Sequence, residues 1–143
     1  MNYKKYEILE HPAELRLRIY GKTPEQLFSN AAEAMAQILS AEAAKFEIKN
    51  QKSKIKIDVK SIDINSLLVD FLSEILAKSQ IDKSVYLVSN VNCQISDVKA
   101  ELKATLIGYP IDHFDEDIKA VTYQDLNIQK IDGIWQTILV FDI

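Results

Sequence analysis

The chain has 143 residues, of which 48% are hydrophobic and 27% are charged, which is the composition of an ordinary globular protein and the length of one domain. We expect that domain to span residues 1–143. The formal net charge of −4 argues against a protein that holds a nucleic-acid backbone over a wide surface, although it leaves room for a local basic patch.

The single cysteine, Cys93, excludes an internal disulfide and a cysteine-rich zinc site. It alternates with Val91 and Ile95, which indicates a small core residue rather than a nucleophile. No apolar run follows the first residues, and no apolar window approaches the roughly 20 residues that cross a bilayer. We therefore expect a cytoplasmic protein.

The first half of the chain predicts short strands and two amphipathic helices. Thr23, followed by Pro24 and Gln26, has the pattern of a capping box at the start of the first helix. Asp63 is expected to cap the second helix, in which apolar residues recur at i, i+3, i+4 and i+7. Strands are predicted at residues 6–9, 15–20, 46–48 and 55–59.

The second half predicts a meander of strands. The Asp132-Gly133 pair is its strongest hairpin signal. The last strand, residues 134–143, is apolar on both faces, so it is expected to be central and covered on both sides. The other predicted segments are strands at residues 85–95 and 102–110, an acidic loop at 112–117 and an extended run at 118–131. Together these elements predict an α+β fold with two amphipathic helices packed on a mainly antiparallel, sandwich-like sheet system.

Lysines alternate with the apolar residues of the predicted strand around Ile57. We interpret Lys54, Lys56 and Lys60 as a solvated face or as protection of a sheet edge, rather than as a nucleic-acid patch.

Motifs for enzymatic chemistry are scarce. The three glycines, at positions 21, 108 and 133, cannot form a glycine-rich phosphate loop. There is no GxSxG element, and only His11 and His113 could supply an imidazole base. The residues alone therefore favour a protein without catalytic activity of its own.

Acidic residues at the two chain ends offer more chemistry. Glu14 begins the polar face of the strand at residues 15–20, and Asp142 ends the central, otherwise apolar last strand, next to the main-chain carboxylate of Ile143. Together these groups would form an all-oxygen anionic site that suits Ca²⁺ or Mg²⁺. The alternative is that Asp142 lies in water while Glu14 pairs with Arg16 or a lysine.

Two further polar groups are candidates. The acidic loop from Asp112 to Asp117 is a rival cluster of oxygen ligands, but it lacks the spacing and central glycine of an EF-hand loop, so a solvated loop is favoured. Lys119, just after that loop, could bind phosphate or a partner, or could pair with Glu116 or Asp117.

Six segments, in order and over essentially the whole chain, resemble the archease family. Each is a weak signal alone, and together they are specific. The opening segment is similar to a "YEFLEHTAD"-like run, and the segment on the second helix to "LLVDWLNELL". The six segments are residues 6–14, 20–32, 67–76, 108–112, 118–123 and Phe141-Asp142-Ile143.

This resemblance implies a function as well as a fold. Archeases assist the RtcB-type RNA ligase, the GTP-dependent enzyme that joins tRNA halves, by promoting its guanylylation and multiple turnover. The resemblance implies that the chain contacts that ligase, reaches tRNA only through it, and binds a divalent metal, usually calcium. The implied metal ligands are Glu14, Asp142 and Ile143, and the residues implied in ligase activation are Lys119, Asp70 and His11.

The chain departs from the family pattern at three positions. Glu14 replaces an aspartate and has a side chain longer by one methylene, Pro12 replaces a threonine, and Gln124 replaces a histidine. We expect these changes to affect the metal site more than the fold or the partner. The alternatives are a chaperone-like module acting on other nucleic-acid-processing enzymes and a metal-dependent hydrolase.

Overall fold

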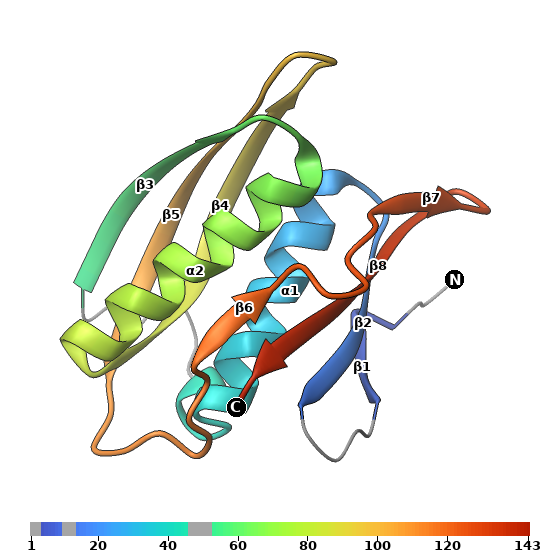
Figure 1. Cartoon of the computed structure of the whole chain (residues 1–143). Helices are drawn as coiled ribbons and strands as arrows, with labels where there is room; N and C mark the ends of the chain where they lie inside the picture. The colour runs from blue at the N-terminus through green and yellow to red at the C-terminus, as the bar shows by residue number, and fades with distance from the viewer. Residues whose placement is uncertain (1–3, 10–13, 46–52) are drawn as a thin grey trace.

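Two helices lie between two antiparallel β-sheets in the computed structural model, which describes residues 4–9, 14–45 and 53–143 (Figure 1). The first sheet has the strand order β1-β2-β8-β6, with β7 also paired to β8, and the second has the order β3-β5-β4. The strands are β1 (Tyr6–Leu9), β2 (Leu15–Gly21), β3 (Ser53–Ser61), β4 (Ser84–Ile95), β5 (Ala100–Pro110), β6 (Ala120–Thr122), β7 (Gln129–Ile131) and β8 (Ile134–Asp142). The expected α+β fold is confirmed.

Helix α1 (Pro24–Leu39) begins at the predicted capping box. The Thr23 hydroxyl accepts a hydrogen bond from the Gln26 N–H at 3.1 Å, and the Gln26 side chain accepts one from the Lys22 N–H at 3.0 Å. The helix starts so close to β2 that a Cβ on Gly21 would lie 2.4 Å from the Leu27 nitrogen. Only glycine therefore allows this approach of strand and helix.

Helix α2 (Ile64–Asp82) begins where Asp63 accepts a hydrogen bond from the Ser66 N–H at 2.7 Å, as predicted. The two helices meet at Phe28 and Phe71, whose ring centroids are 6.0 Å apart. Both side chains are fully buried and join the core, which lies between the helices and the two sheets. No helix in the described part of the chain is long and apolar enough to cross a membrane.

The predicted extended run at residues 118–131 is wrong, because two short strands and a loop occupy it. Strands β6 and β7 both pair with β8, and the chain between them turns at Asp125, whose φ is 56°. Aspartate tolerates this left-handed conformation, which a continuous strand cannot include. The predicted strand at residues 46–48 lies outside the described residues.

Strand β8 is central, as predicted, since β2 flanks it on one side and β6 and β7 on the other. Its covering is less complete than predicted. The helices pack against the face that carries Leu139 and Phe141, which are both fully buried. On the outer face Val140 is buried, whereas Ile134 and Ile138 are only half-buried.

The single thiol is inert at neutral pH. Burial, reinforced by the nearby Glu25 carboxylate, raises the pKa of Cys93 to about 12. Glu25 also accepts a hydrogen bond from the main-chain N–H of Cys93 at 3.2 Å. A thiol that stays protonated is a poor nucleophile, in agreement with the structural role predicted for Cys93.

Candidate functional site

The register of β2 against β8 places the two predicted acids at one point. Leu15 lies opposite Phe141 in this antiparallel pair, so the next position on each strand sets Glu14 opposite Asp142. Opposite residues share a face of the sheet. Because Leu15 and Phe141 face the helices, the two acids belong to the outer face.

Strand β6 adds Lys119 on the other side of β8. Ala120 pairs with Asp142, and the main-chain N–H of Lys119 donates a hydrogen bond to the Asp142 carbonyl at 2.7 Å. The same register sets Lys119 opposite Ile143. Figure 1 shows the C-terminus at this end of β8, beside β6. The structure thus places four of the predicted residues, Glu14, Lys119, Asp142 and Ile143, at the same end of the first sheet. By the alternation of the strands, Lys119 and Ile143 belong to the helix face and the two acids to the outer face.

The Glu14 side chain is 14% exposed, and Gln124 and Arg16 are among its polar neighbours. Its Oε1 atom accepts a hydrogen bond from Gln124 Nε2 at 3.4 Å and lies 3.9 Å from Arg16 Nε. Pairing of Glu14 with Arg16, which the sequence left as an alternative, is therefore present. Arg16 is shared, however, since its Nη1 donates to Asp125 Oδ2 at 2.7 Å. One guanidinium thus contacts two carboxylates.

Gln124 and Asp125 were not predicted as site residues. Both lie in the loop between β6 and β7, where the sequence predicts one extended run. The available signal was Asp125 itself, because aspartate is depleted in strands and common in turns. A loop predicted there could have been placed beside the polar face that carries Arg16.

The donor chemistry of this group fits a hard divalent cation. Asp142 is exposed, and its carboxylate has no hydrogen bond or ion pair to any residue that the structure describes. Glu14 and Asp142 offer only oxygen atoms, the ligands that Ca²⁺ and Mg²⁺ take. Within the described ranges no three His, Cys, Asp or Glu side chains are placed to hold a metal ion.

Asp70 does not join this group in the structure. The Asp70 carboxylate accepts a hydrogen bond from the Ser61 hydroxyl at 2.6 Å, beside the three-stranded sheet. Helix α2 contacts the chain next to Lys119 through Gln80 instead. The Gln80 side chain donates a hydrogen bond to the main-chain carbonyl of Ile118 at 2.9 Å. Gln80 lies about 15 Å further along the helix than Asp70. His11 lies outside the described residues.

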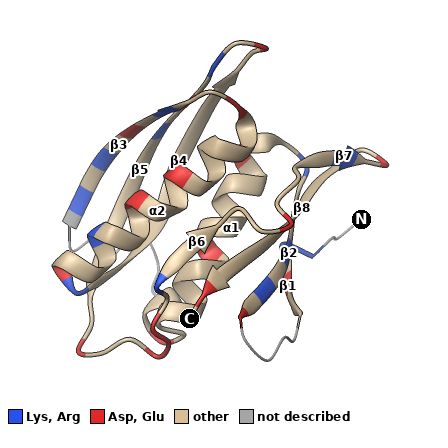
Figure 2. Cartoon of the chain, viewed as in Figure 1, with Lys and Arg blue, Asp and Glu red and all other residues tan. Residues whose placement is uncertain are grey.

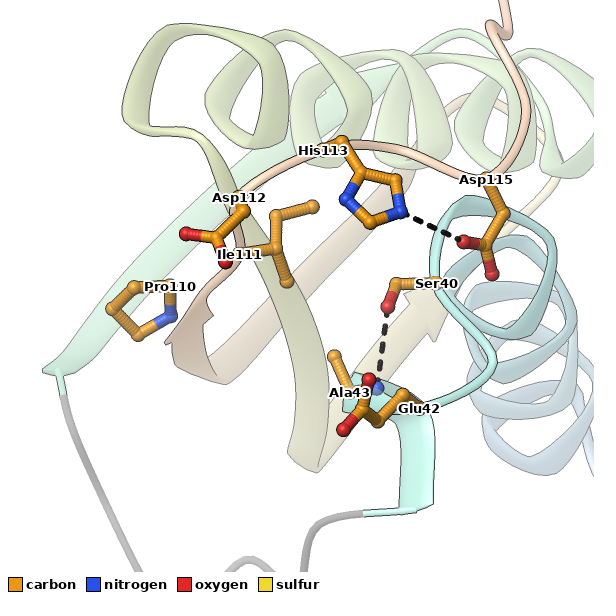
Figure 3. A pocket seen from close by; sticks show the side chains of 8 residues that line it. All are labelled: Ser40, Glu42, Ala43, Pro110, Ile111, Asp112, His113 and Asp115. Atoms are coloured by element: carbon orange, nitrogen blue, oxygen red, sulfur yellow. Dashed lines mark hydrogen bonds and ion pairs between the residues drawn. The ribbon is translucent and has the colours of Figure 1, made fainter.

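The rival acidic loop lines a separate pocket of about 220 Å³ (Figure 3). Asp115 is already engaged there, since its carboxylate accepts a hydrogen bond from the Ala41 N–H at 3.0 Å and lies 3.8 Å from His113 Nε2. Asp112 and His113 are exposed. This loop is therefore tied to the end of α1 by Asp115 rather than arranged around a common ligand, and the candidate functional site remains the group at the chain ends.

Comparisons with known proteins agree along the length of the chain. The model of the Archease protein family (MTH1598/TM1083) matches residues 6–143. A "Protein archease" of Methanosarcina mazei is 39% identical over 146 residues, which cover 98% of this chain and 97% of that protein. The family assignment from sequence is thereby confirmed.

Two solved structures share the fold. A protein of Methanobacterium thermoautotrophicum, solved in solution, superposes with a TM-score of 0.82 at 24% identity and covers 97% of this chain and 99% of its own. A crystal structure from Thermotoga maritima, described as "an archease, possible chaperone", superposes with a TM-score of 0.62 at 17% identity and covers 100% of this chain and 98% of its own. At these identities the likeness concerns the fold, and the family follows from the sequence matches: the chain belongs to the archease family.

Proposed function

We propose that this chain is a cytoplasmic, non-catalytic protein cofactor of an RtcB-type RNA ligase, which it helps to take up guanylate and to turn over repeatedly. Membership of the archease family supports the proposal. The observation that carries it is the register of β2, β8 and β6, which gathers Glu14, Asp142 and Lys119 at one end of the first sheet. These are residues at positions that the family resemblance singles out.

The cation and the lysine have separate roles in this proposal. Glu14, Asp142 and the main-chain carboxylate of Ile143 hold a calcium ion, which offsets the repulsion between these carboxylates when it is bound. Arg16 and Gln124 position Glu14 from the side. Lys119 is exposed, so its ammonium group is available to a partner while its main chain stays in the sheet.

Replacing Lys119 tests the contact with the ligase. Lys119→Ala keeps the main-chain N–H that donates to Asp142, so we expect an unchanged melting temperature. We expect this variant to lose most of the stimulation of ligase guanylylation, because the charge of an exposed lysine strengthens its interaction with a partner protein. The measurement is the initial rate at which the ligase incorporates labelled guanylate from GTP, with and without this protein.

The matched control is Lys130→Ala, which removes an exposed lysine from β7 at the opposite end of β8. It is expected to stimulate the ligase as the unmodified chain does. Full stimulation by Lys119→Ala would remove this lysine from the mechanism.

A chaperone-like module is the second candidate. An open hollow of about 450 Å³ on the outer face of the first sheet favours it, because Tyr20, Ile131 and Ile134 line this hollow with apolar surface. Ile131 is 45% exposed, and such surface is typical of sites that bind other proteins. A chaperone of this kind would raise the yield of folded ligase and would leave its turnover unchanged.

A further inference from the structure

The outer face of the three-stranded sheet carries a row of lysines. Lys54, Lys56 and Lys60 come from β3, and Lys103 comes from β5, where it lies opposite Asp58. We call these four residues the lysine face. All four are exposed, while the alternate residues Ile57 and Val59 are buried on the helix side. Figure 2 shows the blue segments along β3.

The positive charge of the lysine face is only partly offset by acids among the described residues. None of its four lysines forms an ion pair with another residue there, whereas the neighbouring Lys99 contacts Glu101 at 3.3 Å. Asp58 and Glu101 are the acids that the register places on the same face. The face is thus positive on a chain whose formal net charge is −4.

Protection of a sheet edge explains only part of this pattern. Strand β3 is an edge strand, and its lysines can serve that purpose. Lys103 lies on β5, the central strand, where there is no edge to protect. The structure therefore adds to the predicted edge lysines a residue that the edge explanation does not cover.

Amide side chains extend this polar surface across the sheet. Asn92 pairs with Lys103, and Gln94 with Glu101, so both project from β4 on the side of the lysine face. These residues, together with Leu102, line a pocket of about 170 Å³. Amides donate and accept hydrogen bonds, which suits sugar and phosphate oxygens beside the lysine charges.

We propose that the lysine face binds the phosphate backbone of a nucleic-acid duplex. The positive charge and the adjacent amides are complementary to a row of phosphates. The exposed part of this face has no aromatic side chain among the described residues, so it lacks the stacking groups that bind single strands. The face lies on the sheet that does not contain Asp142, and the proposal is independent of the proposed function.

The test is fluorescence anisotropy of a labelled RNA duplex titrated with the whole protein at several salt concentrations, with a DNA duplex of the same sequence as a second arm. Four phosphate contacts predict that log Kobs falls with log salt with a slope of about −3.5. We expect Lys103→Ala to reduce the magnitude of this slope by about 1 and to weaken binding to the same extent whatever the base sequence of the duplex. Binding of both duplexes, or of one, supports the proposal and identifies the nucleic acid.

The matched control is Lys130→Ala, which makes the same change of charge on the other sheet and should leave affinity and slope unchanged. No binding at low salt would overturn the proposal. An equal effect of Lys103→Ala and Lys130→Ala would overturn it too, because attraction would then be a property of the whole surface. A competition experiment separates the two kinds of ligand. If poly-L-glutamate displaces the labelled duplex as effectively as unlabelled duplex does, the lysine face is a site for acidic protein instead.

Discussion

The change Asp142→Asn is expected to lower the Ca²⁺ affinity of the proposed metal site by at least about 100-fold. Asparagine has nearly the same shape and keeps the main-chain hydrogen bond to Lys119, so the end of β8 should remain in place. It removes one of the two acidic side chains that the register of β2 and β8 brings together. Loss of an outer partner of a metal ligand typically costs 10–100-fold in affinity, so loss of a charged ligand should cost at least about 100-fold.

Isothermal titration calorimetry measures this effect, with one ion per chain expected for the unmodified protein. The control is Asp112→Asn in the acidic loop that lines the separate pocket, which should bind as the unmodified chain does. Equal affinity in Asp142→Asn would contradict the site. Loss of binding in Asp112→Asn would move the metal to the acidic loop.

The change Phe71→Ala is expected to have the largest effect on stability. Phe71 is fully buried and its ring packs against that of Phe28 from the other helix, with centroids 6.0 Å apart. The cavity left by such a substitution lowers the free energy of unfolding by about 3–5 kcal/mol. Much of a typical domain's stability of roughly 5–15 kcal/mol would be lost.

Urea denaturation followed by circular dichroism provides the measurement. Phe71→Leu is the companion variant, since it retains most of the apolar volume and should lose less than half as much. A loss below about 1 kcal/mol in Phe71→Ala would mean that the two helices do not share a core at this point.

Local signals in the sequence were sufficient for most of the fold. The caps at Thr23 and Asp63 are read from side chains within three residues of the groups they bind, so sequence alone identifies both helix starts. The Asp132-Gly133 turn has positive φ at both residues, 52° and 81°, as its sequence predicts. In contrast, the pairing of β6 and β7 with β8 joins segments distant in the sequence, and the only local signal for the loop between them is the aspartate at position 125.

Part of the candidate site could likewise be predicted from the sequence, and part of it could not. Glu14 and Asp142 were identified because Glu14 lies at the start of one strand and Asp142 at the end of another, and antiparallel pairing then brings these two strand ends together. The contacts of Arg16 with Asp125 and of Glu14 with Gln124 join residues far apart in the chain, so they required the structure. The lysine face likewise became visible only when β5 was placed between β3 and β4, because Lys103 is distant in sequence from the other three lysines.

The number of ligations that each ligase molecule completes tests the proposed function most directly. Folded, purified RtcB-type ligase from the same organism is mixed with excess RNA halves and GTP, with and without this protein, and joined product is counted per ligase. Because the ligase is already folded, a chaperone that only improves folding leaves the count unchanged. We expect the number of ligations per ligase molecule to rise several-fold when the protein is added. A count that is the same with and without the protein would contradict the proposed function.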